Sequence, residues 1–112
     1  IAAKHKLENL IVMIDYNKVQ ALTTLEDGLP LDNLVAKFEA FNWNTIEIKD
    51  GHSFDEIVPI LQKGNLSSKP CAFIFNTIKG KGVKPFEGDP VWHARKVKDE
   101  DAKIMKKELG LS

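Results

Sequence analysis

Three segments of the chain are rich in apolar residues and short enough to form β-strands. Residues 10–15 and 69–76 are almost unbroken apolar runs, which are typical of strands covered on both faces. Residues 43–48 alternate apolar and polar side chains and include β-branched residues, which also indicates a strand. The pattern therefore predicts three strands.

Apolar residues recur at helical spacing between the first and second predicted strands. A polar segment runs from the first strand to Pro30, and an apolar stripe with i, i+3, i+4, i+7 and i+10 spacing follows it. The stripe comprises Leu31, Leu34, Val35, Phe38 and Phe41. This spacing predicts a helix that faces a core.

A second helix is predicted between the second and third strands. Ser53, with Glu56 three residues later, has the spacing of a capping box. Pro59 lies inside the pattern and predicts a short or bent helix that ends near Gly64. Its expected core face comprises Phe54, Ile57, Val58 and Leu61.

The last part of the chain combines a long loop with a third helix. Residues 79–96 are rich in Gly and Pro, and three acidic residues at 99–101 suit the first turn of a helix. Gly110 is a suitable stop, and the apolar face of this helix comprises Ala102, Met105 and Leu109.

Strands that alternate with helices require crossover connections, and such connections join parallel strands. We therefore assign the chain to the α/β class, as a doubly wound parallel sheet with three parallel strands and flanking helices. At 112 residues and 43% hydrophobic content, the chain has room for a single modest core.

Charge and cysteine usage narrow the possible partners. Sixteen Lys and Arg balance sixteen Asp and Glu, so no overall field attracts nucleic acid or an anionic membrane. No apolar run reaches the length of a membrane span, and the first residues lack the order of a signal peptide. The single cysteine, Cys71, lies in an apolar run, which predicts a core residue without an intramolecular disulfide and a cytoplasmic location. The chain begins with Ile1 instead of Met, and we expect it to be a piece of a longer protein.

The most informative polar segment, residues 15–20, directly follows the first predicted strand. Ligands of open α/β sheets bind beyond the carboxyl ends of the strands. The amide oxygen of Asn17 and the backbone carbonyl of Val19 have a spacing that lets both contact one Mg²⁺ ion in a sharp turn. The alternative is that Asn17 only caps a turn.

Three further polar clusters fall at the same predicted edge. Residues 50–52 either form a turn or contribute to a site. Lys79 and Lys81 alternate with glycines, which suits either a solvated loop or a phosphate-binding loop. His93 follows Trp92 in a constrained loop, so it is either a surface histidine or a positioned imidazole.

Taken together, these segments resemble the thiamin-diphosphate-binding domain of transketolases, in the form found as a separate N-terminal subunit. Residues 6–20 (KLENLIVMIDYNKVQ) resemble the second half of the family's cofactor motif, in which a Gly-Asp-Gly is followed at a distance by an Asn. Residues 38–52 are similar to the family's next helix, strand and turn. The segments 76–83 (NTIKGKGV) and 90–93 (PVWH) match its most recognisable loop.

The resemblance implies a role for several residues. Asn17 would give Mg²⁺ a side-chain oxygen and Val19 a carbonyl oxygen, with cofactor diphosphate oxygens completing the shell. His93 would reach the diphosphate and the polar groups of the donor substrate, and would be the catalytic residue of this chain. Lys79 and Lys81 would border the cofactor. The roles of Asp50 and His52 in such a site are more often structural than catalytic.

The chain also departs from the family pattern. No glycine precedes Asn17, so the Gly-Asp-Gly and its metal-binding aspartate are not among these residues. Ala94 and Arg95 follow the histidine, where the family usually has Gly first. The activating glutamate belongs in this family to another domain. Residues 1–112 therefore resemble the C-terminal part of a PP-type thiamin-diphosphate-binding domain, expected to be inactive alone.

Two classes of function remain open at this stage. The first is part of a transketolase-like transferase that uses thiamin diphosphate and Mg²⁺ to move a two-carbon ketol unit between sugar phosphates. A C-terminal subunit or domain would supply the pyrimidine side of the site, within a dimer of such units. The second is a free-standing, non-catalytic α/β module. Within the enzyme class, the alternative is a deoxyxylulose-phosphate synthase-like enzyme.

Overall fold

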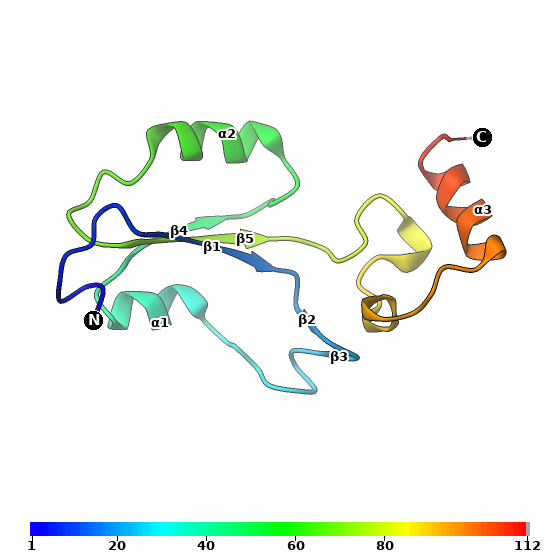
Figure 1. The fold of residues 1–112 in the computed structure, drawn as a ribbon, viewed down its shortest axis with the longest axis horizontal. Coiled ribbons are helices and arrows are strands. Elements are labelled where there is room, and N and C mark those ends of the chain that lie inside the picture. Colours follow the sequence, from blue (N-terminus) through cyan, green and yellow to red (C-terminus); the bar gives the residue numbers. More distant parts are fainter. Residues whose placement is uncertain (112) are drawn as a thin grey trace. The chain divides into compact units, whose positions relative to one another are not determined.

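The computed structural model describes residues 1–111 and contains a three-stranded parallel sheet (Figure 1). The strand order is β1-β5-β4, with bounds Ile11–Tyr16 for β1, Cys71–Asn76 for β5 and Asn44–Ile48 for β4. Cys71 pairs in register with the first residue of each neighbouring strand. The three parallel strands predicted from the sequence are therefore confirmed.

Two helices lie on opposite faces of this sheet (Figure 1). Helix α1, Leu34–Ala40, connects β1 to β4, and helix α2, Phe54–Lys63, connects β4 to β5. Helix α1 begins three residues later than the stripe predicted, because Asn33 is its N-cap and accepts a hydrogen bond from the Ala36 N–H at 3.0 Å. Helices on both faces make the sheet doubly wound, as expected.

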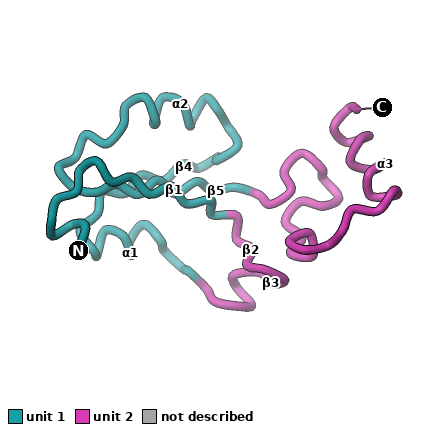
Figure 2. Tube along the Cα trace, viewed as in Figure 1, with its two compact units in different colours: residues 1–16, 31–77 teal, residues 17–30, 78–112 magenta. Residues whose placement is uncertain are grey.

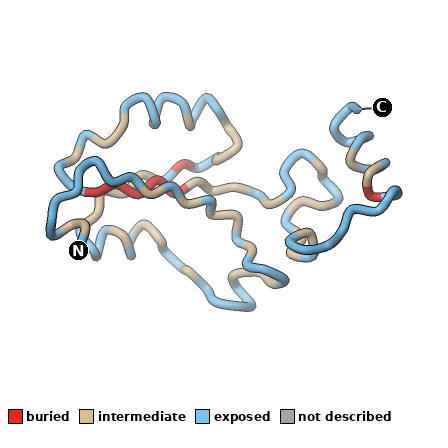
Figure 3. The backbone as a smooth tube through the Cα atoms, in the orientation of Figure 1, coloured by how far each residue is buried: buried red, intermediate tan, exposed pale blue. Residues whose placement is uncertain are grey.

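The core is concentrated on the central strand β5 (Figure 3). Cys71, Ala72, Phe73 and Ile74 are all buried, and Ile48 of β4 joins them. Ile57 and Ile60 of α2 pack against this cluster. The prediction that Cys71 is a core residue is confirmed.

The predicted N-terminus and core face of α2 were partly wrong. Ser53 makes no side-chain cap hydrogen bond, and the Glu56 carboxylate instead accepts from the Asp50 N–H at 3.1 Å. Ile57 packs inward as predicted, but its inward partner is Ile60, while Phe54, Val58 and Leu61 form an exposed stripe. Helix α2 nevertheless contains Pro59 and ends at Lys63 with Gly64 as its C-cap, as expected.

The prediction that the first strand is covered on both faces was wrong for β1 in this chain. Ile11 and Met13 are exposed, Met13 by 59%. Ile11 pairs in register with Cys71 and Met13 with Phe73, so both lie on the face of the sheet on which α2 packs. The physical reason is that β1 is an edge strand, and α2 covers β4 and β5 instead.

The chain divides into two compact units (Figure 2). Unit 1, residues 1–16 and 31–77, contains the sheet with α1 and α2. Unit 2 comprises residues 17–30 and 78–112, of which the structure describes all but Ser112. Its elements are β2 (Val19–Gln20), β3 (Thr23–Thr24), the 3₁₀ helices η1 (Lys84–Phe86) and η2 (Pro90–His93), and α3 (Asp99–Glu108).

Unit 2 matches the sequence prediction in outline. The third helix is confirmed, and the long loop contains only the two short 3₁₀ turns. The small β2-β3 hairpin was not predicted. Within residues 1–111, none of the helices is long and apolar enough to cross a membrane.

Candidate functional site

The carboxyl ends of the three strands of unit 1 are joined by polar contacts. The Thr77 hydroxyl donates a hydrogen bond to the Asp15 carboxylate, linking the ends of β1 and β5. The Gly51 N–H donates to the Asn76 carbonyl at 2.8 Å, linking the segments after β4 and β5. The strand ends are thus held in a fixed arrangement at the edge where the sequence placed the site.

Asp50 stabilises the turn after β4. Its carboxylate accepts a hydrogen bond from the His52 N–H at 2.9 Å. A Cβ atom at Gly51 would approach the Thr77 methyl group to 2.6 Å, so this turn packs closely on the segment after β5. These contacts support the turn interpretation of residues 50–52.

The segment after β1 forms a tight turn at the start of unit 2. The Asn17 Oδ1 atom accepts a hydrogen bond from the Val19 N–H at 3.0 Å. Lys18, between them, has φ 65°, in the left-handed region that few residues other than Gly and Asn adopt. The turn that the sequence offered as an alternative role for Asn17 is therefore present, and it places the amide oxygen beside the backbone of Val19.

The hairpin pairing also fixes the direction of the Val19 carbonyl. The Lys18 carbonyl accepts from the Leu25 N–H at 2.9 Å, and Val19 pairs with Thr24. The Lys18–Leu25 pair is thus hydrogen-bonded, and the next pair, Val19–Thr24, is not, because the two kinds of pair alternate in an antiparallel ladder. The N–H and C=O of Val19 therefore both point away from β3. The N–H meets Asn17 Oδ1 on that side, so the Val19 carbonyl and the Asn17 amide oxygen lie on the same side of the hairpin.

This donor pair fits a hard cation that keeps other oxygen ligands. Mg²⁺ commonly combines a few protein oxygens with water and phosphate oxygens. Among residues 1–111 no group of three or more His, Cys, Asp or Glu side chains is placed to hold a metal ion. Water and diphosphate oxygens would complete the shell of a metal held at Asn17 and Val19.

The loop that carries Lys79 and Lys81 is ordered by its own contacts. The Lys79 carbonyl accepts from the Gly88 N–H at 2.8 Å, and Gly80 has φ 72°. Glu87 Oε1 accepts from the Gly82 N–H at 3.1 Å and lies 3.9 Å from the Lys81 ammonium. The Glu87 carboxylate thus already contacts the Gly82 N–H and the Lys81 ammonium, two groups that a bound phosphate would also contact.

His93 is exposed at the end of η2, in a turn that is fixed on both sides. Asp89 caps η2 by accepting from the Val91 N–H at 2.9 Å. The Trp92 ring contacts the Phe86 ring, with centroids 4.1 Å apart. Strand β3 lies beside η2. The hairpin that begins with Val19 and the turn that carries His93 are therefore neighbours within unit 2.

Sequence reasoning missed the residues that organise these loops. Glu87 was not singled out, and Asp101 was noted only as a charge at the start of a helix. Asp101 is instead buried and paired with Arg95, whose Nη2 lies 3.0 Å from Asp101 Oδ1. The i, i+6 spacing of Arg95 and Asp101 across a helix start gave no local signal of this pair.

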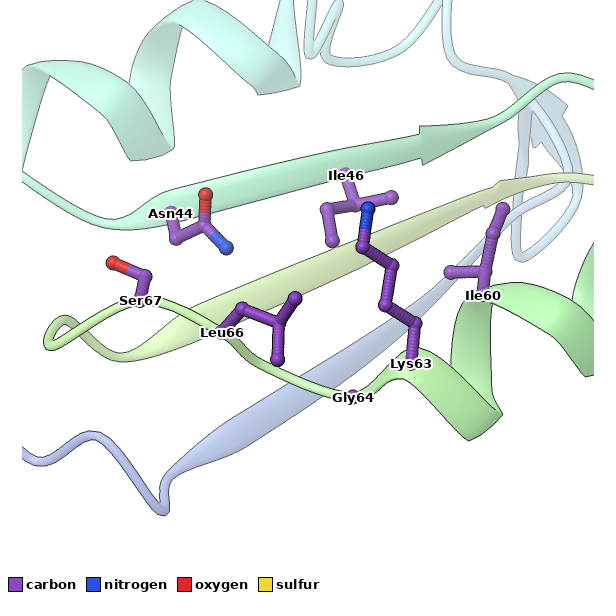
Figure 4. A pocket seen from close by; sticks show the side chains of 7 residues that line it. All are labelled: Asn44, Ile46, Ile60, Lys63, Gly64, Leu66 and Ser67. Carbon is purple, nitrogen blue, oxygen red and sulfur yellow. The ribbon is translucent and has the colours of Figure 1, made fainter.

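A cleft in unit 1 lies apart from the strand ends discussed above (Figure 4). Its volume is about 470 Å³, and it lies beside Asn44, where β4 begins, and Lys63, where α2 ends. It is lined by Asn44, Ile46, Ile60, Lys63, Gly64, Leu66 and Ser67. None of the residues predicted to bind cofactor lines it.

The chain is similar in sequence to known transketolase domains and subunits. The family model described as transketolase, thiamine diphosphate binding domain, matches residues 1–112. The chain is 36% identical over 108 residues to one subunit of the apulose-4-phosphate transketolase of Actinobacillus succinogenes. It is 38% identical over 109 residues to the 6-deoxy-6-sulfo-D-fructose transketolase subunit SqwG of a Clostridium species. Each match covers 96% of this chain and 39% of the relative, so the chain spans about two fifths of their length.

A solved structure shows the same fold. The crystal structure of transketolase from Campylobacter jejuni superimposes with a TM-score of 0.84 at 30% sequence identity. The match covers 97% of this chain and 17% of that protein. From its fold, its strand-end segments and the match along its whole length, the chain belongs to the transketolase family of thiamin-diphosphate-binding domains.

Proposed function

We propose that this chain is part of a transketolase-type enzyme that binds thiamin diphosphate with Mg²⁺ and transfers a two-carbon ketol unit between sugar phosphates. The relatives named above are transketolase subunits by name, and they act on different sugars. One of these names contains a sugar phosphate and the other a sulfonated sugar, so the proposal does not commit to one sugar. Bound thiamin diphosphate would supply the carbanion chemistry.

The observation that carries the proposal is that the Asn17 amide oxygen and the Val19 carbonyl lie on the same side of the β2-β3 hairpin. Both follow directly from the carboxyl end of β1, the place where α/β sheets bind ligands. Their role would be to hold Mg²⁺, and through it the diphosphate, in one orientation. Asn17 would combine this role with its turn-forming hydrogen bond, because an amide oxygen has two lone pairs.

His93 and the two loop lysines would act on the anionic side of the bound cofactor. The exposed His93 imidazole, on a turn fixed by Asp89 and Trp92, would donate hydrogen bonds to the diphosphate or the donor sugar. Lys79 has no part in the Glu87 contacts described above and would attract the diphosphate. Lys81 would first have to leave Glu87, so we expect it to contribute less than Lys79.

The proposed site needs groups from outside the chain. A carboxylate ligand for Mg²⁺ and an activating glutamate would come from other parts of the complete protein and from a partner subunit or domain, within a dimer of such units. The names of the relatives as subunits support a partner. A cytoplasmic location is part of the proposal and rests only on the buried, unpaired thiol of Cys71.

Calorimetric titration with thiamin diphosphate and Mg²⁺ tests the proposal. We expect the complete protein with its partner subunit to bind the cofactor in a Mg²⁺-dependent way, and the isolated 112-residue chain to show no measurable binding. The reason is that one amide and one carbonyl oxygen offset little of the dehydration cost of Mg²⁺ without a carboxylate.

The matched control is the same titration of the complete protein with EDTA in place of Mg²⁺, where binding should be lost. Absence of binding by the complete protein with Mg²⁺ would contradict the proposed function. Tight, Mg²⁺-dependent binding by the isolated chain would contradict the requirement for ligands from outside it.

A further inference from the structure

Asp101 is the only charged residue that is buried within residues 1–111, with 7% of its surface exposed. Its carboxylate accepts three hydrogen bonds. Arg95 Nη2 donates to Oδ1 at 3.0 Å and to Oδ2 at 3.1 Å, and the Lys98 N–H donates to Oδ2 at 3.0 Å. Pairing and hydrogen bonds of this kind offset the cost of removing a carboxylate from water. Asp101 therefore holds Arg95 against the first turn of α3.

Arg95 in turn contacts the aromatic ring next to His93. Its guanidinium carbon lies 4.5 Å from the centroid of the Trp92 ring. The Trp92 ring also contacts Phe86. Arginine binds aromatic faces through its planar cation, and lysine lacks this planar group. The Arg95 side chain thus connects a buried carboxylate to Trp92.

Fixing Trp92 restricts His93. Short 3₁₀ turns have poor hydrogen-bond geometry and depend on their surroundings for order. Asp89 fixes the beginning of η2, while the Arg95 N–H donates to the Val91 carbonyl at 3.2 Å beyond its end. The turn that carries the exposed His93 side chain is therefore held at both ends and at Trp92.

We propose that Arg95 and Asp101 are positioning residues for His93. The ion pair holds the guanidinium on Trp92, and this contact sets the direction in which η2 presents the imidazole. The proposal rests on the proposed function, because it assumes that His93 contacts the cofactor or the donor sugar. Neither Arg95 nor Asp101 is assigned a contact with these molecules.

A double-mutant cycle in the complete protein with its partner subunit tests this role. Asp101→Asn removes the charge at nearly constant shape, and Arg95→Lys keeps the charge but loses the planar group. With saturating cofactor and substrates, we expect kcat to fall about tenfold for Asp101→Asn and about threefold for Arg95→Lys. In a His93→Ala background, both changes should alter kcat less than about twofold, because the residue they position is gone.

The control variant is Asp99→Asn, which makes the same chemical change in the first turn of α3 outside the Arg95 contacts. It should leave kcat unchanged. Equal losses from Asp101→Asn with and without His93 would overturn the positioning role, and so would full activity of His93→Ala.

A second measurement does not require activity. Ring signals of His93 in NMR spectra of selectively labelled complete protein should shift or broaden in Asp101→Asn and Arg95→Lys, and stay unchanged in Asp99→Asn. Unchanged signals in all three variants would overturn the proposal. If the His93 signals change in Asp101→Asn and Arg95→Lys but the complete protein shows no ketol-transfer activity, the positioning of His93 is supported and the proposed function is contradicted.

Discussion

The two units of the chain are stabilised by different kinds of contact. Every buried residue of unit 1 is apolar or proline, and these residues lie mainly on the central strand β5. In the described part of unit 2 the single buried residue is a carboxylate, Asp101, paired with Arg95. Unit 1 therefore depends on burial of apolar surface, and unit 2 on specific polar and aromatic contacts.

The apolar core and the proposed binding residues lie in different units. All five residues proposed to bind metal or cofactor, Asn17, Val19, Lys79, Lys81 and His93, belong to unit 2. Binding residues commonly lie on loops that a rigid scaffold positions, and such segments are often the less stable part of a protein. Substitutions in the core of unit 1 should thus change stability, while substitutions of the five proposed binding residues should mainly change binding.

The largest expected effect is in the core of unit 1. Phe73→Ala removes a ring that is 1% exposed, and in the complete protein it should lower the free energy of unfolding by about 3–5 kcal/mol. Urea denaturation measures this loss. The control is Phe54→Ala in α2, where the ring is 76% exposed and the loss should stay below about 0.5 kcal/mol. Similar losses for both variants would mean that β5 is not the core.

A smaller loss is expected from the loop of unit 2. Gly80 has φ 72°, and a Cβ atom there would lie 3.0 Å from the Phe86 carbonyl oxygen. Gly80→Ala should lower the free energy of unfolding by about 2 kcal/mol, because left-handed strain and crowding add. Gly110→Ala is the matched control, since Gly110 follows the C-cap of α3, has φ 65° and has open space around it. Its loss should be about 1 kcal/mol, from strain alone.

Asn17→Ala tests the division between binding and stability directly. The loss of an oxygen ligand should lower the affinity of the complete protein for thiamin diphosphate at limiting Mg²⁺ by at least about tenfold, or roughly 1.4 kcal/mol. Raising Mg²⁺ should restore part of it. Loss of the hydrogen bond to Val19 should also lower stability by about 1 kcal/mol.

Asn33→Ala is the control for Asn17→Ala, because Asn33 makes a similar hydrogen bond, to the Ala36 N–H, in unit 1. It should lower stability by about 1 kcal/mol and leave cofactor affinity unchanged. If Asn17→Ala behaves in the same way, Asn17 is a turn residue and the metal assignment is wrong.

The fold was predictable because apolar periodicity follows secondary structure closely. The strands and helices of unit 1 appeared at the expected places, and burial of β5 followed from its apolar run. The same signal failed for β1, since a run of apolar residues does not reveal whether a helix covers them, and Met13 is exposed. The face of α2 was wrong because five apolar residues cover more than one stripe, and only packing selects Ile57 and Ile60.

The candidate site was predictable only as a set of residues. The spacing of Asn17 and Val19 suggested convergence on one metal ion, which stays a prediction, while the structure shows the turn and the hairpin that bring these two residues together. The contacts that order the site were not predictable. Glu87 reaches Gly82 and Lys81, and Asp101 reaches Arg95, through loop conformations that no period in the sequence encodes.

The smallest effect concerns Cys71 in the core of unit 1. Burial raises the pKa of its thiol, and the hydrogen bond from Asn44 opposes this shift only in part. Above the ordinary thiol pKa of about 8.5, the unfolded chain loses a proton that the folded chain keeps, so the thiol's contribution to stability is lost as pH rises. Between about pH 7 and pH 10, the free energy of unfolding should fall more steeply in the complete protein than in its Cys71→Ala variant, by at most about 1.4 kcal/mol per pH unit. Parallel curves would show that the thiol titrates alike in both states, and that burial in β5 does not perturb it.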